Sequence, residues 1–328
     1  MRRREFITLL GSSVFVWPLA ARAQHPAMPV VGVVGGGSAA GFTRELAAFR
    51  EGLNESGYVE GQNITVEYYW LEGKYNRLPA TMADLVRRQV TVIATSGSGP
   101  AVLAAKAATD TIPIVFGLGE DPVQLGLVAS LARPGGNATG INFFANEVVA
   151  KRLRLFHDLV PKAVRIAILL NPTNAASTRS TLQAVQASAS AIGLQTSTLN
   201  ATTPGEIDAA FDTLEREHFD ALFVAPDAFF TSRAVQFAML GALHRIPASY
   251  GVSEFATAGG LMSYGADLAE MNSQIAIYIG RILKGAKPAD LPVLQSSKFE
   301  FLLNLQMARA LHIEVPPAVQ SIVDEVIE

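Results

Sequence analysis

Cysteine is absent from the 328 residues of the chain. This absence excludes disulfide bonds, thiolate metal sites, a cysteine nucleophile and a lipid-modified N-terminal cysteine. The sequence also lacks the phosphate-binding loop G-x-x-x-x-G-K-[ST], the zinc motif H-E-x-x-H and the nucleophile motif G-x-S-x-G. Its five histidines are scattered, and none pairs with another at metal-ligand spacing. We therefore expect no catalytic residues, no metal, no cofactor and no enzymatic activity.

Long apolar runs are also missing after residue 23, where no segment is apolar enough to span a membrane. The formal net charge of −3 becomes −6 once the four arginines and one glutamate of residues 1–23 are removed. The remaining chain has no run of lysine and arginine. We therefore expect a mature chain that does not insert into a membrane and does not bind nucleic acid.

The N-terminus has the pattern of an export signal. Arg3-Arg4-Glu5-Phe6 reads as a twin-arginine motif, residues 7–20 are mostly apolar, and Ala21-Arg22-Ala23 has small residues where a signal peptidase cleaves. Fourteen helical residues would extend about 21 Å, short of a bilayer core of about 30 Å, so an anchor is disfavoured. The pattern predicts that residues 1–23 are a twin-arginine signal peptide and that the mature protein is in the periplasm.

The rest of the chain alternates apolar runs with segments whose apolar residues have helical spacing. The runs are continuously apolar, which indicates parallel sheets covered on both faces. In the first half the expected strands are 30–36, 64–70, 90–95 and 112–117, and the expected helices are 41–56, 78–88 and 100–108. In the second half the expected strands are 164–171, 194–200, 221–225 and 246–251, and the expected helices are 175–192, 206–217 and 228–244. This repetition predicts two similar α/β lobes.

The boundaries of the two lobes follow from the position of the repeat and from the long tail of the chain. We expect an N-terminal lobe (N-lobe) of residues 28–142 plus 267–294, and a C-terminal lobe (C-lobe) of residues 143–266 plus 295–328. The chain would then cross between the lobes three times, near residues 140–144, 264–267 and 295–299.

Candidate ligand-binding residues follow the strands, because ligands of open parallel sheets bind beyond the carboxyl ends of the strands. In the N-lobe they are Gly37, Ser38, Ser96, Gly97, Ser98 and Phe116, and in the C-lobe Asn171, Asp227 and Tyr250. The serines could hold an anion at a helix N-terminus, Asp227 could bind an amine, and the aromatic residues could cover apolar ligand surface. The set suits a zwitterion such as an amino acid. For any single residue, a structural role in capping or core packing explains its presence as well as ligand binding does.

Three stretches of the sequence carry a resemblance to a known family. They are the leader, the segment 119–137 with Glu120-Asp121-Pro122, and Lys151-Arg152-Leu153. With these stretches the chain resembles the periplasmic binding proteins of tryptophan/tyrosine-type importers over nearly its whole length. The resemblance implies an α/β fold of the type I periplasmic binding protein class: two Rossmann-like lobes with parallel sheets, joined by three crossovers, with the ligand between them.

The resemblance also implies a function and further site residues. Serines after the third strand, an acidic residue such as Asp227, and Tyr264 lie near the ligand in such proteins, and Asp121 of the shared segment joins the candidates. The chain departs from aromatic amino-acid binders at residues 119–120, where they carry threonine. The implied function is capture of a small polar or amino-acid-like ligand for an ABC permease and its ATPase, by a protein that we expect to be a monomer.

Two alternatives remain open from the sequence. Gly35-Gly36-Gly37 followed by Ser38-Ala39-Ala40 matches a dinucleotide fingerprint, which would suit an exported NAD(P)-type Rossmann oxidoreductase. The acidic residue on the next strand, Glu67, however lies about 30 residues further on, where about 20 is expected. A solute sensor for a receptor kinase would use the same fold as an importer subunit, so the sequence does not separate these two functions.

Overall fold

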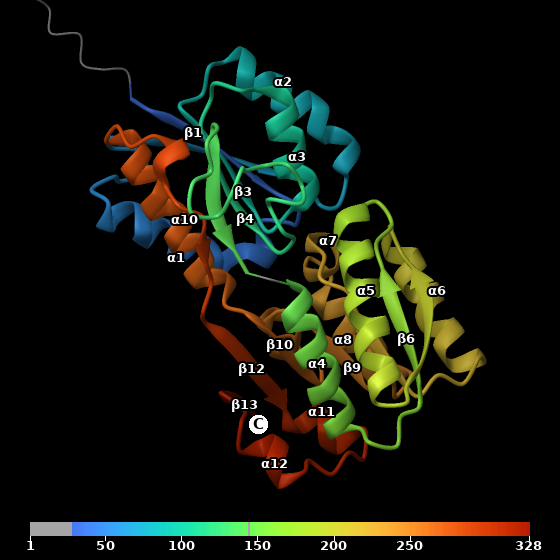
Figure 1. Ribbon diagram of the computed structural model, residues 1–328. Coiled ribbons are helices and arrows are strands. Elements are labelled where there is room, and N and C mark those ends of the chain that lie inside the picture. The colour runs from blue at the N-terminus through green and yellow to red at the C-terminus, as the bar shows by residue number, and fades with distance from the viewer. Residues whose placement is uncertain (1–27, 144) are drawn as a thin grey trace, which may run out of the picture.

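The computed structural model describes residues 28–143 and 145–328, which form two lobes that are each built around one β-sheet (Figure 1). The predicted signal peptide, residues 1–23, lies outside the described residues. Within the described part of the chain, no helix is both long enough and apolar enough to cross a bilayer.

The N-lobe sheet has the strand order β11-β5-β4-β3-β1-β2, and all neighbouring strands are parallel. The strands are β1 (Val30–Gly35), β2 (Thr65–Trp70), β3 (Val92–Ser96), β4 (Ile114–Leu118), β5 (Ala138–Asn142) and β11 (Leu294–Gln295). One face is covered by α2 (Leu78–Arg87) and α3 (Gly99–Ala108), and the other by α1 (Thr43–Glu55) and α10 (Leu268–Leu283). Short 3-10 helices are η1 (Ala40–Phe42), η2 (Tyr75–Arg77) and η3 (Pro288–Asp290).

The C-lobe sheet has the order β13-β12-β10-β9-β8-β6-β7, in which only the β10–β12 pair is antiparallel. Its strands are β6 (Arg165–Leu170), β7 (Gln195–Asn200), β8 (Ala221–Val224), β9 (Ala248–Tyr250), β10 (Met262–Ala266), β12 (Phe299–Asn304) and β13 (Glu325–Ile327). One face is covered by α4 (Ala145–Leu159) and α5 (Ala175–Ala191), and the other by α6 (Pro204–Arg216), α8 (Ala234–Leu243) and α9 (Ser253–Thr257). The remaining helices are α7 (Ala228–Thr231), α11 (Leu305–Ala310) and α12 (Pro317–Gln320).

The chain passes between the two sheets three times: from β5 to α4, from β10 to α10, and from β11 to β12. The third passage is short, because only residues 296–298 separate β11 in one sheet from β12 in the other. Buried strands such as β3, β4 and β10 are the continuous apolar runs of the sequence, whereas the edge strands β2 and β7 are partly or largely exposed. The predicted α/β fold with two Rossmann-like lobes and three crossovers is confirmed, with one antiparallel strand pair in an otherwise parallel C-lobe sheet.

One expected helix is interrupted in the structure. Residues 228–244 were predicted as a single helix, but α7 ends at Thr231 and α8 begins at Ala234. The Ser232 hydroxyl donates to the carbonyl oxygen of Phe229 at 2.7 Å, and Arg233 has non-helical backbone angles. A serine side chain that bonds to nearby backbone competes with the helical pattern, which accounts for the break. The short α7 lies at the boundary between the two lobes (Figure 1).

Candidate ligand site between the lobes

A cavity of about 870 Å³, its open mouth included, lies between the two lobes. Loops at the carboxyl ends of β3, β4, β8 and β9 contribute Gly97, Gly119, Asp227 and Gly251 to its wall. Much of the remaining wall is apolar, with Phe42, Phe143, Val148, Val149, Val252 and Phe255. The cavity therefore occupies the place where ligands of parallel sheets bind.

Asp227 is the buried acidic group of the C-lobe wall. It follows β8 and caps α7, accepting a hydrogen bond from the backbone N–H of Phe229 at 3.0 Å. The side-chain amides of Asn171 and Asn174 donate to its two oxygens at 2.9 and 3.0 Å. Burial raises the pKa of Asp227, while these hydrogen bonds act in the opposite direction. Among the described residues, only neutral donors bond to this carboxylate at the cavity wall.

Glu120 supplies a second carboxyl group from the N-lobe, in the loop after β4. Burial, and to a lesser extent the charge of Asp227, raises the pKa of Glu120. Two acidic groups from opposite lobes therefore line one cavity, and bringing them together without a cation is unfavourable. A positively charged ligand group between them would relieve this repulsion.

Arg152, on α4, is the basic group of the same wall and is only 1 % exposed. Its Nη2 donates to the carbonyl oxygen of Val224 at 2.7 Å, and its guanidinium lies 3.9 Å from the centre of the Phe223 ring. Burial lowers the pKa of Arg152 to about 9. Within the described residues no carboxylate forms an ion pair with it.

The two lobes touch each other next to the cavity, so the structure is a closed arrangement. A Cβ atom added to Gly36 would lie 2.8 Å from the Cβ of Ala228 in α7, and one added to Gly73 would lie 2.8 Å from Phe229. The hydroxyl of Tyr75, in η2, donates across the boundary to Asp227 at 3.3 Å. The glycine run that resembled a dinucleotide fingerprint therefore faces a helix of the opposite lobe.

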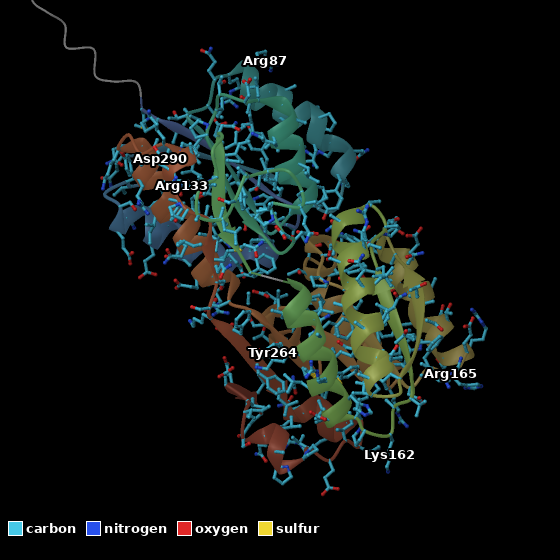
Figure 2. All side chains as sticks on the ribbon, in the orientation of Figure 1. Arg87, Arg133, Lys162, Arg165, Tyr264 and Asp290 are labelled. Atoms are coloured by element: carbon cyan, nitrogen blue, oxygen red, sulfur yellow. The ribbon has the colours of Figure 1, made fainter. Side chains whose placement is uncertain are left out.

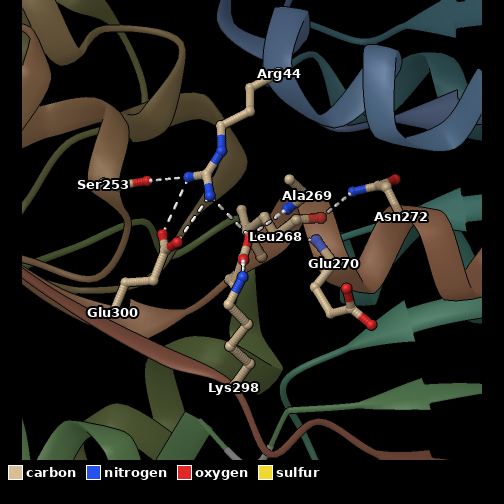
Figure 3. Close-up of polar contacts among 9 residues, drawn as sticks. Arg44, Ser253, Leu268, Ala269, Glu270, Asn272, Lys298 and Glu300 are labelled. Carbon is tan, nitrogen blue, oxygen red and sulfur yellow. Dashed lines mark hydrogen bonds and ion pairs between the residues drawn. The ribbon is translucent and has the colours of Figure 1, made fainter. Parts of the chain in front are cut away.

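A second set of contacts joins the lobes at the β10–α10 crossover (Figure 3). Arg44, on α1, donates to both carboxylate oxygens of Glu300 on β12, at 2.7 and 3.0 Å, and to Ser253 of α9 at 3.0 Å. It also donates to Asp267, the N-cap of α10, at 3.2 Å. Burial would raise the pKa of Asp267, but the hydrogen bond from Lys298, those from the helix N–H groups and the charge of Arg44 hold it below its usual range.

The structure brings some of the sequence-predicted residues to the cavity and places others behind it. Gly97 and Asp227 line the cavity. Asn171 is not part of the cavity wall, and its side-chain amide donates to Asp227. Ser98 caps α3, accepting from the N–H of Ala101 at 3.4 Å.

Other predicted residues hold loops or crossover elements in place. The Ser96 hydroxyl donates to the side chain of Asn272 at 2.8 Å. Asp121 accepts hydrogen bonds from two backbone N–H groups of its own loop. Gly37 approaches the backbone of α7, with an added Cβ 3.1 Å from the Ala228 oxygen, and Ser38 accepts from the N–H of Gly41 at 3.3 Å.

The predicted aromatic residues pack in lobe cores. Phe116 is fully buried among the side chains of α2 and α3. Tyr250 stacks on Phe255, with ring centres 4.3 Å apart, and is 1 % exposed. Tyr264 lies in the C-lobe (Figure 2), where Lys151 is 4.7 Å from its ring centre. These three side chains lie outside the cavity wall because their strand positions direct them toward the helices that cover each sheet.

The sequence reasoning did not select four groups that the structure puts at or beside the site: Glu120, Arg152, Asn174 and Tyr75. Glu120 and Arg152 lie in stretches that carried the family resemblance, but neither was singled out as a ligand contact. Arg152 lies on α4, and no sequence pattern shows that its side chain reaches the end of β8. A loop carboxylate two residues beyond a buried strand, as in Glu120, is the one local signal available.

Comparison with known proteins agrees with this geometry. Residues 31–327 match the family of ABC transporter substrate binding proteins. The chain is 25 % identical over 268 residues to a tyrosine-binding protein of Clostridioides difficile (strain R20291), covering 81 % of this chain and 76 % of that protein.

Solved structures share the fold. A conserved domain protein of Vibrio cholerae gives a TM-score of 0.83, and an ABC domain in complex with L-Trp from Streptococcus pneumonia gives 0.82. A ligand-free, open substrate binding protein of Clostridium difficile gives 0.63. Each is 24 % identical to this chain, and each match covers 91 % of this chain and 99 % of the other.

A two-lobed α/β fold with a cavity at the carboxyl ends of both sheets is the fold of type I periplasmic binding proteins. The chain belongs to the ABC transporter substrate binding protein family, whose match extends from β1 to the final strand.

Proposed function

We propose that the protein is the periplasmic solute-binding subunit of an ABC importer and that it captures a small polar or amino-acid-like ligand, aromatic ligands included, between its lobes. It then presents the ligand to a membrane permease with its ATPase, acts as a monomer and catalyses no reaction. The observation that carries this proposal is the cavity between the lobes, where charged side chains of both signs meet inside a mostly apolar wall. A zwitterionic molecule with an apolar side chain has the matching chemistry.

The site residues of this proposal are those at the cavity wall and directly behind it. Asp227 is the proposed partner of the ligand amine, with Asn171 and Asn174 holding its carboxylate in place. Gly97 forms part of the N-lobe wall, and Ser98 behind it caps the start of α3. Two comparisons support an amino acid: one relative is a tyrosine-binding protein, and one structural neighbour was solved with L-Trp. The chain also superposes better on that complex than on the ligand-free, open protein.

The ligand class is tested by purifying the mature form from residue 24 without refolding. Small molecules released from it are identified by mass spectrometry, and the twenty L-amino acids are then screened for an increase in melting temperature. A ligand present at 100 times its Kd stabilises the protein by about 2.7 kcal/mol, which is readily measured. If no released molecule and no amino acid binds, the proposed capture of an amino-acid-like solute is wrong.

Export is tested separately. Replacing Arg3 and Arg4 by lysine should leave a precursor in the cytoplasm, because the twin-arginine receptor reads the paired guanidinium groups. The double variant is compared with the wild type by cell fractionation. Normal accumulation of the variant in the periplasm would show that the chain does not use the twin-arginine route.

A further inference from the structure

Arg152 is a buried cation that forms no ion pair within the described part of the chain. Arg152 is 1 % exposed, yet only one of its five N–H groups makes a hydrogen bond given by the structure, to the carbonyl of Val224. Its buried Nε atom has no partner. The ring of Phe223 contributes a favourable cation–π contact, which is much weaker than an ion pair with a carboxylate.

A charge in this environment is costly unless something compensates it. Transfer of an isolated ion from water to a protein interior costs several kcal/mol even after relaxation, and native proteins pair such groups or leave them to a ligand. The N-lobe and C-lobe carboxylates of the cavity do not compensate Arg152, because within the described residues neither Glu120 nor Asp227 lies within ion-pair distance of it. The unpaired guanidinium therefore points to an anion that comes from outside the chain.

Arg152 borders the cavity in which this anion would lie. A Cβ atom added to Gly251 would lie 2.6 Å from its Nη1, so only glycine at this position leaves the guanidinium in its place. Gly251 and Arg152 both line the cavity, as does Asp227, which follows the neighbouring strand β8. A cationic and an anionic group of the same lobe thus face one cavity, each held by its own set of contacts.

We propose that Arg152 binds the carboxylate of the ligand, while Asp227 binds its amine, so that the ligand is a free amino acid with both groups unmodified. This inference rests on the proposed function and names the substrate class of the same site. Arg152 is a specificity-determining residue, because a guanidinium that no described carboxylate pairs with selects against ligands that lack an anionic group. A solute with the same side chain but an amide in place of the carboxylate leaves Arg152 buried and uncompensated.

The first test uses the wild-type protein and needs no variant. The amino acid that binds best in the screen is compared with its carboxamide, with its decarboxylated amine and with its deaminated acid by isothermal titration calorimetry. We expect the carboxamide and the amine to bind roughly 10- to 150-fold more weakly than the amino acid, which is the range for the loss of one hydrogen bond to a charged group. Equal affinities of the amino acid and its carboxamide would overturn the assignment of Arg152.

The second test separates a ligand contact from a structural role. Arg152→Met should abolish detectable binding while the unliganded protein melts at the wild-type temperature or above, because an uncompensated buried charge has been removed. Arg154→Met, at an exposed position of the same helix, is the matched control and should change neither quantity. A lower melting temperature with unchanged affinity would make Arg152 a structural cation.

The outcomes also distinguish the inference from the function on which it rests. If the protein binds a neutral solute such as a sugar, solute capture stands and the carboxylate assignment is overturned. If no solute of any class binds, the proposed function fails together with it. Binding of an amino acid that is lost in Arg152→Met supports both.

Discussion

Replacement of Glu45 by glutamine should remove a pH dependence of ligand binding. Glu45, on α1 of the N-lobe, is 2 % exposed, and within the described residues neither of its carboxyl oxygens has a hydrogen-bond partner, while Glu254 on α9 of the C-lobe lines the same pocket as Glu45. Burial, followed by the contact with Glu254, raises the pKa of Glu45 to about 9, against the opposing charge of Arg44. The same arginine is already bound by Glu300 and Asp267, so these two groups leave little of its charge for Glu45.

The direction and size of the effect follow from the two pKa values. In an open protein the two carboxyls separate and the pKa of Glu45 returns toward its ordinary value of 4.5. Below that pH both forms carry the proton, and closure is most favourable. As the pH rises from 4.5 through about 9, the closed form still holds a proton that the open form has lost. Closure, and the binding that requires it, weakens by about 1.4 kcal/mol per pH unit, or about 100-fold between pH 6 and pH 8.

The assay is isothermal titration of the protein with an amino acid that it binds, at several pH values. Each titration is repeated in two buffers of different ionisation enthalpy, so that the number of protons taken up on binding can be calculated. The wild type should take up close to one proton on binding, whereas Glu45→Gln should take up none and bind more tightly than the wild type at high pH. Glu51→Gln, at an exposed position of the same helix, should behave as the wild type. Wild-type affinity that is constant over this range would refute the reasoning.

Three further predictions concern the cavity and the closing surface. Asp227→Asn should weaken binding of the amino acid by about 1.5–3 kcal/mol, the range for a charged hydrogen bond, and calorimetry that finds unchanged affinity would limit Asp227 to capping α7. Gly36→Ala should prevent full closure, because the new Cβ would lie 2.8 Å from the Cβ of Ala228. Solution scattering should then show no ligand-induced decrease in the radius of gyration of this variant. The wild type should contract, and so should the control Gly205→Ala, because nothing lies within 4 Å of a Cβ added at Gly205. Tyr75→Phe removes the hydrogen bond between the lobes and should destabilise the closed form by about 0.5–1.5 kcal/mol, seen as faster hydrogen exchange in α7 with ligand bound; an unchanged exchange rate would contradict this.

The fold could be predicted closely from the sequence, because its signal is local. Continuous apolar runs fix the buried parallel strands, and the expected 112–117 run corresponds to β4 at Ile114–Leu118. The break between α7 and α8 was missed because it depends on one serine hydroxyl that bonds to the backbone, and apolar spacing continues across it.

The site was only partly predictable, for a different physical reason. The loops that follow the strands can be located from the sequence, and Gly97 and Asp227 do reach the cavity. Which side chain turns toward the cavity depends on the packing of whole elements. The side chains of Phe116 and Tyr250 pack in the cores of their lobes. The side chain of Arg152 reaches from α4 to the end of β8, and no sequence pattern predicts this contact.

Three glycines of the N-lobe, Gly36, Gly37 and Gly73, lie directly against α7 on the closing surface. A glycine has no rotamers to lose on burial, whereas ordering a long polar side chain costs up to about 2 kcal/mol of conformational entropy. The lobes can therefore meet here with little entropic cost, and the free energy of ligand binding is not consumed in ordering this surface. Specificity can therefore change through the cavity residues while this part of the closing surface stays the same.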